Sequence, residues 1–311
     1  MRRCLQLARC GRLGAAPNPM VGAVVVCDGR IIGEGYHQRC GQAHAEVNAI
    51  ASVREPELLL QSTIYVSLEP CAHYGKTPPC AQLIIDKRIP RVVVGCGDPF
   101  AQVDGRGITM LREAGVEVSV GVLEEECRWL NRRFITYHTE HRPYITLKWA
   151  QSQDGFIDRP RTRADEPPVC FSSPTTQALV HQLRAENEAI LVGRRTMELD
   201  RPSLTVRRWN GRNPMRVVLS GSSVAYDSCV TYTSREEALA DLWKKGVQSL
   251  LVEGGRETLQ GFIDAGLWDE ARIETAPLTL GEGVKAPLIE GKLGEKVLID
   301  GRNLAYIYKN S

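Results

Sequence analysis

The sequence predicts two consecutive α/β domains, and three observations support this fold class. A chain of 311 residues is long for a single hydrophobic core. Short apolar runs alternate with helical patterns, which is typical of a layered α/β fold. The alternation stops at a polar stretch that ends in proline, residues 139–143, and then starts again. We therefore expect domains at residues 1–141 and 143–311.

The first domain begins with a short helical pattern over residues 1–13. Two β-branched runs, residues 21–27 and 30–35, then flank Asp28 and Gly29, an arrangement typical of a β-hairpin. Helical and strand-like patterns follow in alternation over residues 44–54, 63–68, 80–87, 91–95, 107–114, 116–120 and 123–133. This order predicts a mixed sheet with helices on both faces.

The second domain repeats the alternation. Strand-like runs are expected at residues 144–149, 189–192, 216–219 and 249–253. Helical patterns lie at residues 174–186 and 236–245 and from residue 257 onward. We expect a second, separate α/β layer.

Composition restricts the classes of function. Hydrophobic residues make up 43% and charged residues 24% of the chain, as in an ordinary globular enzyme. The net charge of +2 argues against a nucleic-acid-binding protein, which would carry a basic strip. The N-terminal residues lack the apolar stretch of a signal peptide, and no run is long enough to span a membrane. We therefore expect a cytoplasmic protein.

A metal site is indicated by three residues in the first domain. His44 precedes Glu46 by two positions, Cys71 follows a proline, and Cys80 comes nine residues later. One imidazole and two thiolates supply three zinc ligands and leave a fourth position for water, which is the arrangement of a catalytic site. Zinc lowers the pKa of that water to about 7, and Glu46 is placed to shuttle its proton. This order of residues is the signature of zinc nucleobase deaminases.

The spacing sets a geometric condition, because residues two apart do not share a face in the middle of a helix. The pair can converge if His44 lies at the start of its helix. Cys80 is likewise expected to open a helix, whose N-terminal amides favour the thiolate. A structural zinc would need a fourth protein ligand, for which His73 is the nearest candidate.

Four stretches of the first domain resemble the deaminase half of the bifunctional deaminase/reductase family of riboflavin biosynthesis: PNPMVGAVVV (17–26), HAEVNAI (44–50), VSLEPCAHYGKTPPC (66–80) and GCGDPFAQVDGRGI (95–108). The resemblance implies a cytidine-deaminase-like fold. It also implies zinc-dependent deamination of 2,5-diamino-6-(5-phosphoribosylamino)pyrimidin-4-one. Asn18 and the loop 73–77 would then contact the substrate. The family usually has asparagine where this chain has Phe100.

Most of the second domain is similar to the reductase half of the same family, through YITLKWAQSQDG (144–155), SSPTTQALVHQLRAENEAILVG (172–193), TMELDRPSLTVR (196–207) and VEGG (252–255). This resemblance implies a dihydrofolate-reductase-like fold and an NADPH-dependent reduction of the ribosyl group to a ribityl chain. The implied NADPH contacts are Ala150, Thr196, Asp200, Ser220 or its neighbour Gly221, and the segment Gly255, Arg256, Glu257, Thr258, Leu259, Gln260 and Gly261. The implied substrate contacts are Arg184, Leu204, Arg207 and Glu253.

The reduction needs an acid near the ring oxygen or nitrogen of the sugar. Asp200 is the first candidate for this proton, and Lys148 lies in a strand from which it could reach the sugar. Cys170 stands where the family commonly has a tryptophan. A deaminase with a non-catalytic second domain, used for dimerisation or for holding substrate, is therefore the alternative hypothesis. A zinc-stabilised RNA-binding or RNA-editing protein is a second alternative, disfavoured by the near-neutral charge. The family also suggests a homodimer or higher homo-oligomer.

Overall fold

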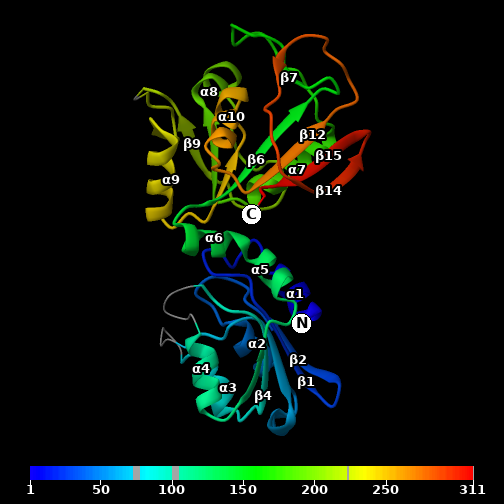
Figure 1. The fold of residues 1–311 in the computed structure, drawn as a ribbon, viewed down its shortest axis with the longest axis vertical. Coiled ribbons are helices and arrows are strands. Elements are labelled where there is room, and N and C mark those ends of the chain that lie inside the picture. Colours follow the sequence, from blue (N-terminus) through cyan, green and yellow to red (C-terminus); the bar gives the residue numbers. More distant parts are fainter. Residues whose placement is uncertain (73–77, 100–104, 223, 311) are drawn as a thin grey trace. The chain divides into compact units, whose positions relative to one another are not determined.

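The computed structural model describes residues 1–72, 78–99, 105–222 and 224–310. The chain divides into two compact units, Met1–Glu140 and His141–Ser311. Each unit is an α/β layer built around its own sheet (Figure 1). Within the described residues, no helix combines the length and the apolar character needed to cross a bilayer.

The first sheet is mixed and has the strand order β2-β1-β3-β4-β5. Strands β1 (Gly22–Cys27) and β2 (Arg30–Tyr36) form the predicted antiparallel hairpin. Asp28 and Gly29 make its turn, both with positive φ, as a tight hairpin connection requires. The remaining strands, β3 (Thr63–Leu68), β4 (Arg91–Cys96) and β5 (Glu117–Val120), are parallel to one another.

Helices cover both faces of this sheet, as predicted. On one face, α2 (Ala45–Ala51), α3 (Cys80–Asp86) and α4 (Arg106–Glu113) pack on alternate residues of the strands, such as Val25, Val66 and Val94. On the other face, α1 (Arg2–Arg9) and α5 (Glu124–Leu130) enclose a smaller apolar cluster. A 3-10 helix, η1 (Pro56–Gln61), was not expected.

The helix predicted over residues 123–133 is interrupted. It forms α5 and then α6 (Arg132–Glu140), with Asn131 between them. The amide of Asn131 donates to the Met20 carbonyl at 2.9 Å and accepts from the Met20 N–H at 2.8 Å. This tertiary contact accompanies the interruption, and α6 then extends into the stretch that we expected to be a linker.

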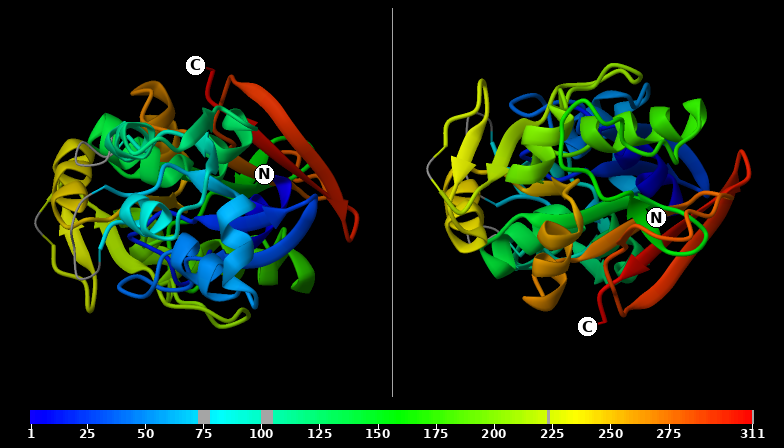
Figure 2. Two further views of the ribbon diagram at one scale, coloured as in Figure 1. Left: turned by 90° about the horizontal axis from the view of Figure 1, so that it is seen from below. Right: turned by 90° about the horizontal axis from the view of Figure 1, so that it is seen from above.

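The second sheet has eight strands in the order β10-β9-β8-β11-β6-β12-β15-β14. Its central strands were predicted: β6 (Tyr144–Gln151), β8 (Ala189–Gly193), β9 (Met215–Leu219) and β11 (Ser249–Val252). Its other four strands were not: β10 (Val230–Tyr232), β12 (Glu270–Thr275), β14 (Lys292–Ile299) and β15 (Arg302–Tyr308). Strands β7 (Phe156–Asp158) and β13 (Val284–Lys285), also not predicted, form a separate two-stranded sheet. Strands β14 and β15, drawn in red, lie at one edge of the sheet (Figures 1 and 2).

Two helical layers enclose this sheet. On one face, α9 (Arg235–Lys244) and α10 (Arg256–Asp264) bury an apolar cluster that includes Leu147, Trp149, Ala271 and Ile273 of β6 and β12. On the other face, α7 (Pro174–Ala185) and α8 (Arg194–Asp200) pack against Ile190, Val192 and Leu251. Residues of β6 and β12 that alternate with the apolar ones therefore face α7.

Candidate metal centre and nucleotide pocket

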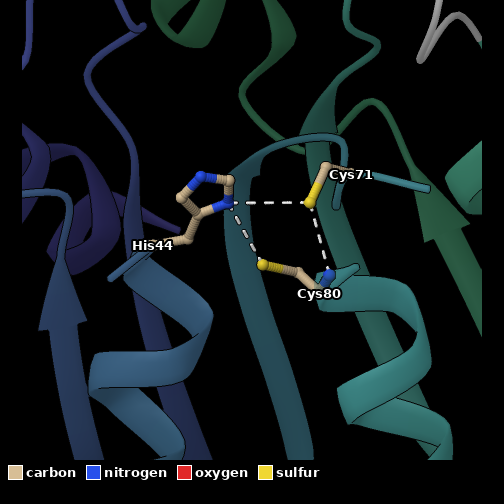
Figure 3. A group of neighbouring side chains, drawn as sticks. All are labelled: His44, Cys71 and Cys80. Carbon is tan, nitrogen blue, oxygen red and sulfur yellow. Dashed lines mark hydrogen bonds between the residues drawn. The ribbon is translucent and has the colours of Figure 1, made fainter. Parts of the chain in front are cut away.

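The three predicted zinc ligands lie together in the folded chain. The Nδ1 atom of His44 is 3.6 Å from the Cys71 sulfur and 3.3 Å from the Cys80 sulfur (Figure 3). All three ligand atoms lie within 4.8 Å of one another. Zinc–sulfur distances of about 2.3 Å and zinc–nitrogen distances of about 2.0 Å place tetrahedral ligand atoms about 3.5 to 3.8 Å apart. The observed spacing fits one zinc ion.

Each ligand lies where the backbone changes direction. His44 is the N-cap of α2 with extended backbone angles, so its imidazole and the Glu46 carboxylate can face the same point. Cys71 follows the carboxyl end of β3, and Cys80 is the first residue of α3. The Cys80 N–H donates to the Cys71 sulfur at 3.3 Å. The geometric condition set by the two-residue spacing is met.

The sulfurs of Cys71 and Cys80 shift each other's pKa in opposite directions. The Cys80 thiol donates a hydrogen bond to Cys71 and lowers the pKa of Cys71 to about 4. The same neighbour, together with burial, raises the pKa of Cys80. Two thiolates this close repel each other, and a dication between them removes that repulsion. The donor set therefore fits a zinc ion better than it fits a pair of free thiols.

Glu46 is the buried acid beside this group. Its residue is only 3% exposed, and burial raises the pKa of the carboxyl to about 7, to which the charge of Cys71 contributes. Among the described residues, the metal-binding group consists of His44, Cys71 and Cys80. His73, the candidate for a structural fourth ligand, lies outside the described residues.

Asn18 lies close to the metal ligands. Its side-chain nitrogen is 3.1 Å from Nε2 of His37, and the His37 ring meets the His44 ring edge to face at 5.5 Å between centroids. The position is compatible with the predicted substrate contact. The loop 73–77 and Phe100, the other sites considered on this side, fall outside the described residues.

Glu69 is a buried carboxylate close to Cys71 in the sequence that the sequence analysis did not single out. This buried carboxylate, 4% exposed, accepts backbone N–H bonds from Gly105 at 3.0 Å, Gly107 at 2.9 Å and Ile108 at 3.3 Å. It thereby joins the strand end that carries Cys71 to the start of α4. In the sequence, only its position two residues before Cys71 connected Glu69 with the metal site. Gly105, Gly107 and Ile108, which donate these hydrogen bonds, lie more than 30 residues farther along the chain.

The second domain contains a pocket of about 930 Å³. Its lining includes nine of the predicted residues: Lys148, Ala150, Thr196, Asp200, Glu253, Gly255, Arg256, Glu257 and Thr258. Gly221 lines it as well, whereas Ser220 is buried behind it. Leu259, Gln260 and Gly261 lie farther along α10, outside the lining.

The start of two helices opens onto this pocket. Gly193 is the N-cap of α8 and Gly255 the N-cap of α10, and both residues line it. A Cβ at Gly193 or Gly254 would collide with the Thr258 side chain, so only glycine lets the strand ends pass this closely. Free backbone N–H groups at helix starts bind phosphates. A volume of this size and two such N-termini fit a nucleotide cofactor such as NADPH.

The remaining predicted substrate contacts form a separate cluster along α7. Arg184 donates two hydrogen bonds to Glu253, at 3.0 and 2.7 Å. His181 accepts from the backbone N–H of Arg207 at 3.0 Å. Leu204 is buried in the apolar layer under α7 and adopts a positive φ. Of this cluster, only Glu253 also lines the pocket.

Asp200 is held by an arginine that the sequence analysis did not single out. Arg161 donates to Asp200 at 2.6 Å and to Asp158 at 2.7 Å. Burial opposes the charge of Arg161, but these two carboxylates raise its pKa above the ordinary value. Both residues line the pocket.

Comparisons with known proteins agree with this architecture. Residues 1–96 match the family model of the cytidine and deoxycytidylate deaminase zinc-binding region, and residues 143–303 match that of the RibD C-terminal domain. The riboflavin biosynthesis protein RibD of Aquifex aeolicus is 39% identical over 318 residues, covering 91% of this chain and 88% of its own length. RibD of Escherichia coli is 35% identical over 332 residues, covering 92% and 89%.

Solved structures agree as well. A deaminase/reductase from Thermotoga maritima superposes with a TM-score of 0.88 at 35% identity, covering 100% of this chain and 97% of its own. RibD of Acinetobacter baumannii gives a TM-score of 0.89 at 28% identity, covering 100% and 98%. The chain therefore belongs to the RibD family of riboflavin biosynthesis proteins, in which a zinc-binding deaminase domain is joined to a reductase domain.

Proposed function

We propose that this chain carries out two successive steps of riboflavin synthesis. Residues 1–141 deaminate 2,5-diamino-6-(5-phosphoribosylamino)pyrimidin-4-one, and residues 143–311 reduce the ribosyl group of the product to ribityl. The cofactors are Zn²⁺ and NADPH. The observation that carries the proposal is the group of His44, Cys71 and Cys80 with the buried Glu46 beside it.

Deamination replaces an amino group of the pyrimidine by oxygen from water. Zinc held by three protein ligands supplies the Lewis acidity that makes a water nucleophilic near neutral pH. Glu46 accepts a proton from this water and returns it to the ring nitrogen and the departing ammonia. Its buried position beside the three metal ligands suits a group that takes a proton from one reactant and passes it to the other.

Reduction requires that the sugar ring open and that hydride reach C1′. Bound NADPH supplies the hydride. As the C1′–O bond breaks, its electron pair goes to the ring oxygen, which takes a proton, and the nitrogen lone pair forms a C=N bond. Hydride addition to C1′ then gives the ribityl chain. An acid must therefore stand near the ring oxygen.

We propose Lys148 as this acid. Asp200, the first candidate from the sequence, accepts a hydrogen bond from Arg161 at 2.6 Å, so its carboxyl group is already engaged by that side chain. Lys148 lines the same pocket, and burial lowers its pKa below the ordinary value. Asp200 keeps its predicted place among the cofactor contacts. Replacing Lys148 by Met should abolish reduction, while Asp200→Asn should mainly raise the KM for NADPH.

Metal analysis combined with ammonia release from the diaminopyrimidine substrate tests the first activity. Following NADPH absorbance with the deaminated product tests the second. We expect about one zinc per deaminase domain, ammonia release, and NADPH oxidation. Ammonia release without NADPH oxidation under any condition would favour the alternative, a non-catalytic second domain. The observation that favours this alternative is Cys170, which stands where the family commonly has a tryptophan.

We also propose a cytoplasmic location and a homo-oligomer. The thiolates of Cys71 and Cys80 must stay reduced to bind zinc, which a reducing compartment ensures. Strand β14 lies at the end of the second sheet, and its Leu293 and Leu298 are 58% and 68% exposed. An exposed edge of this kind suits pairing with a second copy. Light scattering on the purified chain distinguishes a dimer from a monomer.

A further inference from the structure

The second domain contains a buried guanidinium to which no described residue is hydrogen-bonded. Arg272 lies in the middle of β12 and is 3% exposed. Among the described residues, none supplies a hydrogen-bond partner to any of its three guanidinium nitrogens. Burying a charge without a partner is among the costliest features of a protein interior. Its presence here calls for a function that offsets the cost.

The register of the sheet places Arg272 beside Lys148. Strands β12 and β6 are parallel, and Arg272 is the Cα partner of Lys148. Their neighbours Ala271 and Leu147 belong to the apolar cluster on the opposite face. Because side chains alternate along a strand, Arg272 and Lys148 project from the same face, toward α7, about 5 Å apart at the backbone.

The carboxylates on this face are engaged elsewhere. Glu253 is paired with Arg184 through two hydrogen bonds. Glu274 accepts from the hydroxyls of Ser172 and Thr176, at 2.8 and 2.7 Å. The elements packed against Lys148 contribute these charged groups: Glu253 after β11, Arg272 and Glu274 of β12, Arg184 of α7, and the pocket-lining pair of Arg161 and Asp200. Glu270 of β12 accepts a hydrogen bond from the Tyr144 hydroxyl. Arg302 of β15 lies 4.0 Å from Glu274.

We propose that Arg272 is a positioning residue for the reduction: its fixed charge beside Lys148 makes the lysine ammonium release its proton to the ring oxygen more readily. This inference rests on the proposed function of the second domain. Arg272 lies outside the pocket lining and acts through Lys148. Burial lowers the pKa of Lys148, and Arg272 lowers it further, against the opposing effects of Glu253 and Glu274. An acid whose pKa approaches the working pH transfers its proton more effectively.

The lysine itself can be followed without catalysis. The full chain is labelled with ¹³C,¹⁵N-lysine, and the signal lost in Lys148→Met identifies the group in an NMR titration. Arg272→Met and Arg272→Gln remove the charge and should move the Lys148 titration to higher pH. Arg272→Lys keeps the charge and should leave it near its original position. Arg216→Met, on β9 of the same sheet, serves as the matched control and should not shift it.

The kinetic consequence follows in the same variants. For Arg272→Met, the pH at which kcat/KM for reduction falls on the alkaline side should move to higher pH, together with the Lys148 titration. Thermal unfolding should occur at the same or a higher temperature, because the substitution removes an unpaired buried charge. An unchanged Lys148 titration in both Arg272→Met and Arg272→Gln would overturn the proposal. A shifted titration in a protein that never oxidises NADPH would instead contradict the proposed reduction.

Discussion

At the scale of single residues, the metal site depends on where a helix begins. His44 has extended backbone angles and Glu46 is already helical, so a spacing of two residues brings both side chains to one point. This condition could be predicted, because the motif is local and each of its residues has a defined chemical role. Arg161 and Arg272 could not be predicted in the same way. Their significance depends on Asp200 and Lys148, which are far from them along the chain.

Replacing Glu46 by Gln tests the proton shuttle. The amide keeps the shape of the side chain but cannot accept the proton, so ammonia release should fall by about 100-fold or more. Zinc content should be unchanged, because Glu46 is not among the three ligands. Glu57→Gln, an exposed change in the same domain, is the control. Ammonia release at the original rate by Glu46→Gln would show that another group moves the proton.

Replacing Glu253 by Gln tests the buried ion pair with Arg184. Burial alone would raise the pKa of Glu253, but Arg184 and the neighbouring cations lower it below 4.5. A carboxyl with a lowered pKa stabilises the fold above its unfolded-state pKa and loses this effect as pH falls through the folded-state pKa. At pH 7, Glu253→Gln should therefore cost about 3 kcal/mol. The difference from the unaltered protein should shrink below pH 4.5, measured by denaturant unfolding at several pH values. A pH-independent difference would exclude this role.

At the scale of elements, the accuracy of prediction followed the strength of the local pattern. Helix α7 starts where Ser173 and Pro174 indicate, because serine caps the helix and proline suits its first turn. Strand β12 was missed, since Glu270, Arg272 and Glu274 alternate as on a solvent-exposed strand. They are buried against α7 instead. The alternating charged pattern therefore indicates exposure, whereas hydrogen bonds from Thr176 to Glu274 and from Tyr144 to Glu270 hold these carboxylates inside the fold.

Helix α4 and the strand end that carries Cys71 are packed without spare room. A Cβ at Gly107 would overlap the carbonyl oxygen of Pro70, the residue before Cys71. Gly107→Ala should therefore displace Cys71 and weaken zinc affinity by about tenfold or more, as changes around metal ligands commonly do. Competition with a chromogenic chelator measures this. Gly97→Ala is the control, because the nearest atom to its added Cβ is 3.9 Å away. Equal zinc affinity in both variants would refute the argument.

At the scale of the whole molecule, the two chemistries rest on separate cores. The apolar clusters of the first sheet contain residues of the first unit alone, and those of the second sheet residues of the second unit alone. The metal ligands all belong to Met1–Glu140, and the lining of the pocket belongs to His141–Ser311.

Removing the metal should therefore separate the two activities. Treatment with a strong chelator should abolish ammonia release, while NADPH oxidation with the deaminated substrate should persist at close to its original rate. Restoring zinc should bring back ammonia release. Equal loss of both activities on chelation would indicate that the second site depends on the metal.

The order of strands in the second sheet also bears on how the chain folds as it is made. Domains generally fold as units, those nearest the N-terminus first during synthesis. Everything the first sheet requires is present once residue 140 has left the ribosome. By contrast, β15 lies between β12 and β14, and Tyr308 is the register partner of Glu270. The flank of β12 thus stays open until residue 308 has been added, so the zinc-binding half can mature while the second domain is still incomplete.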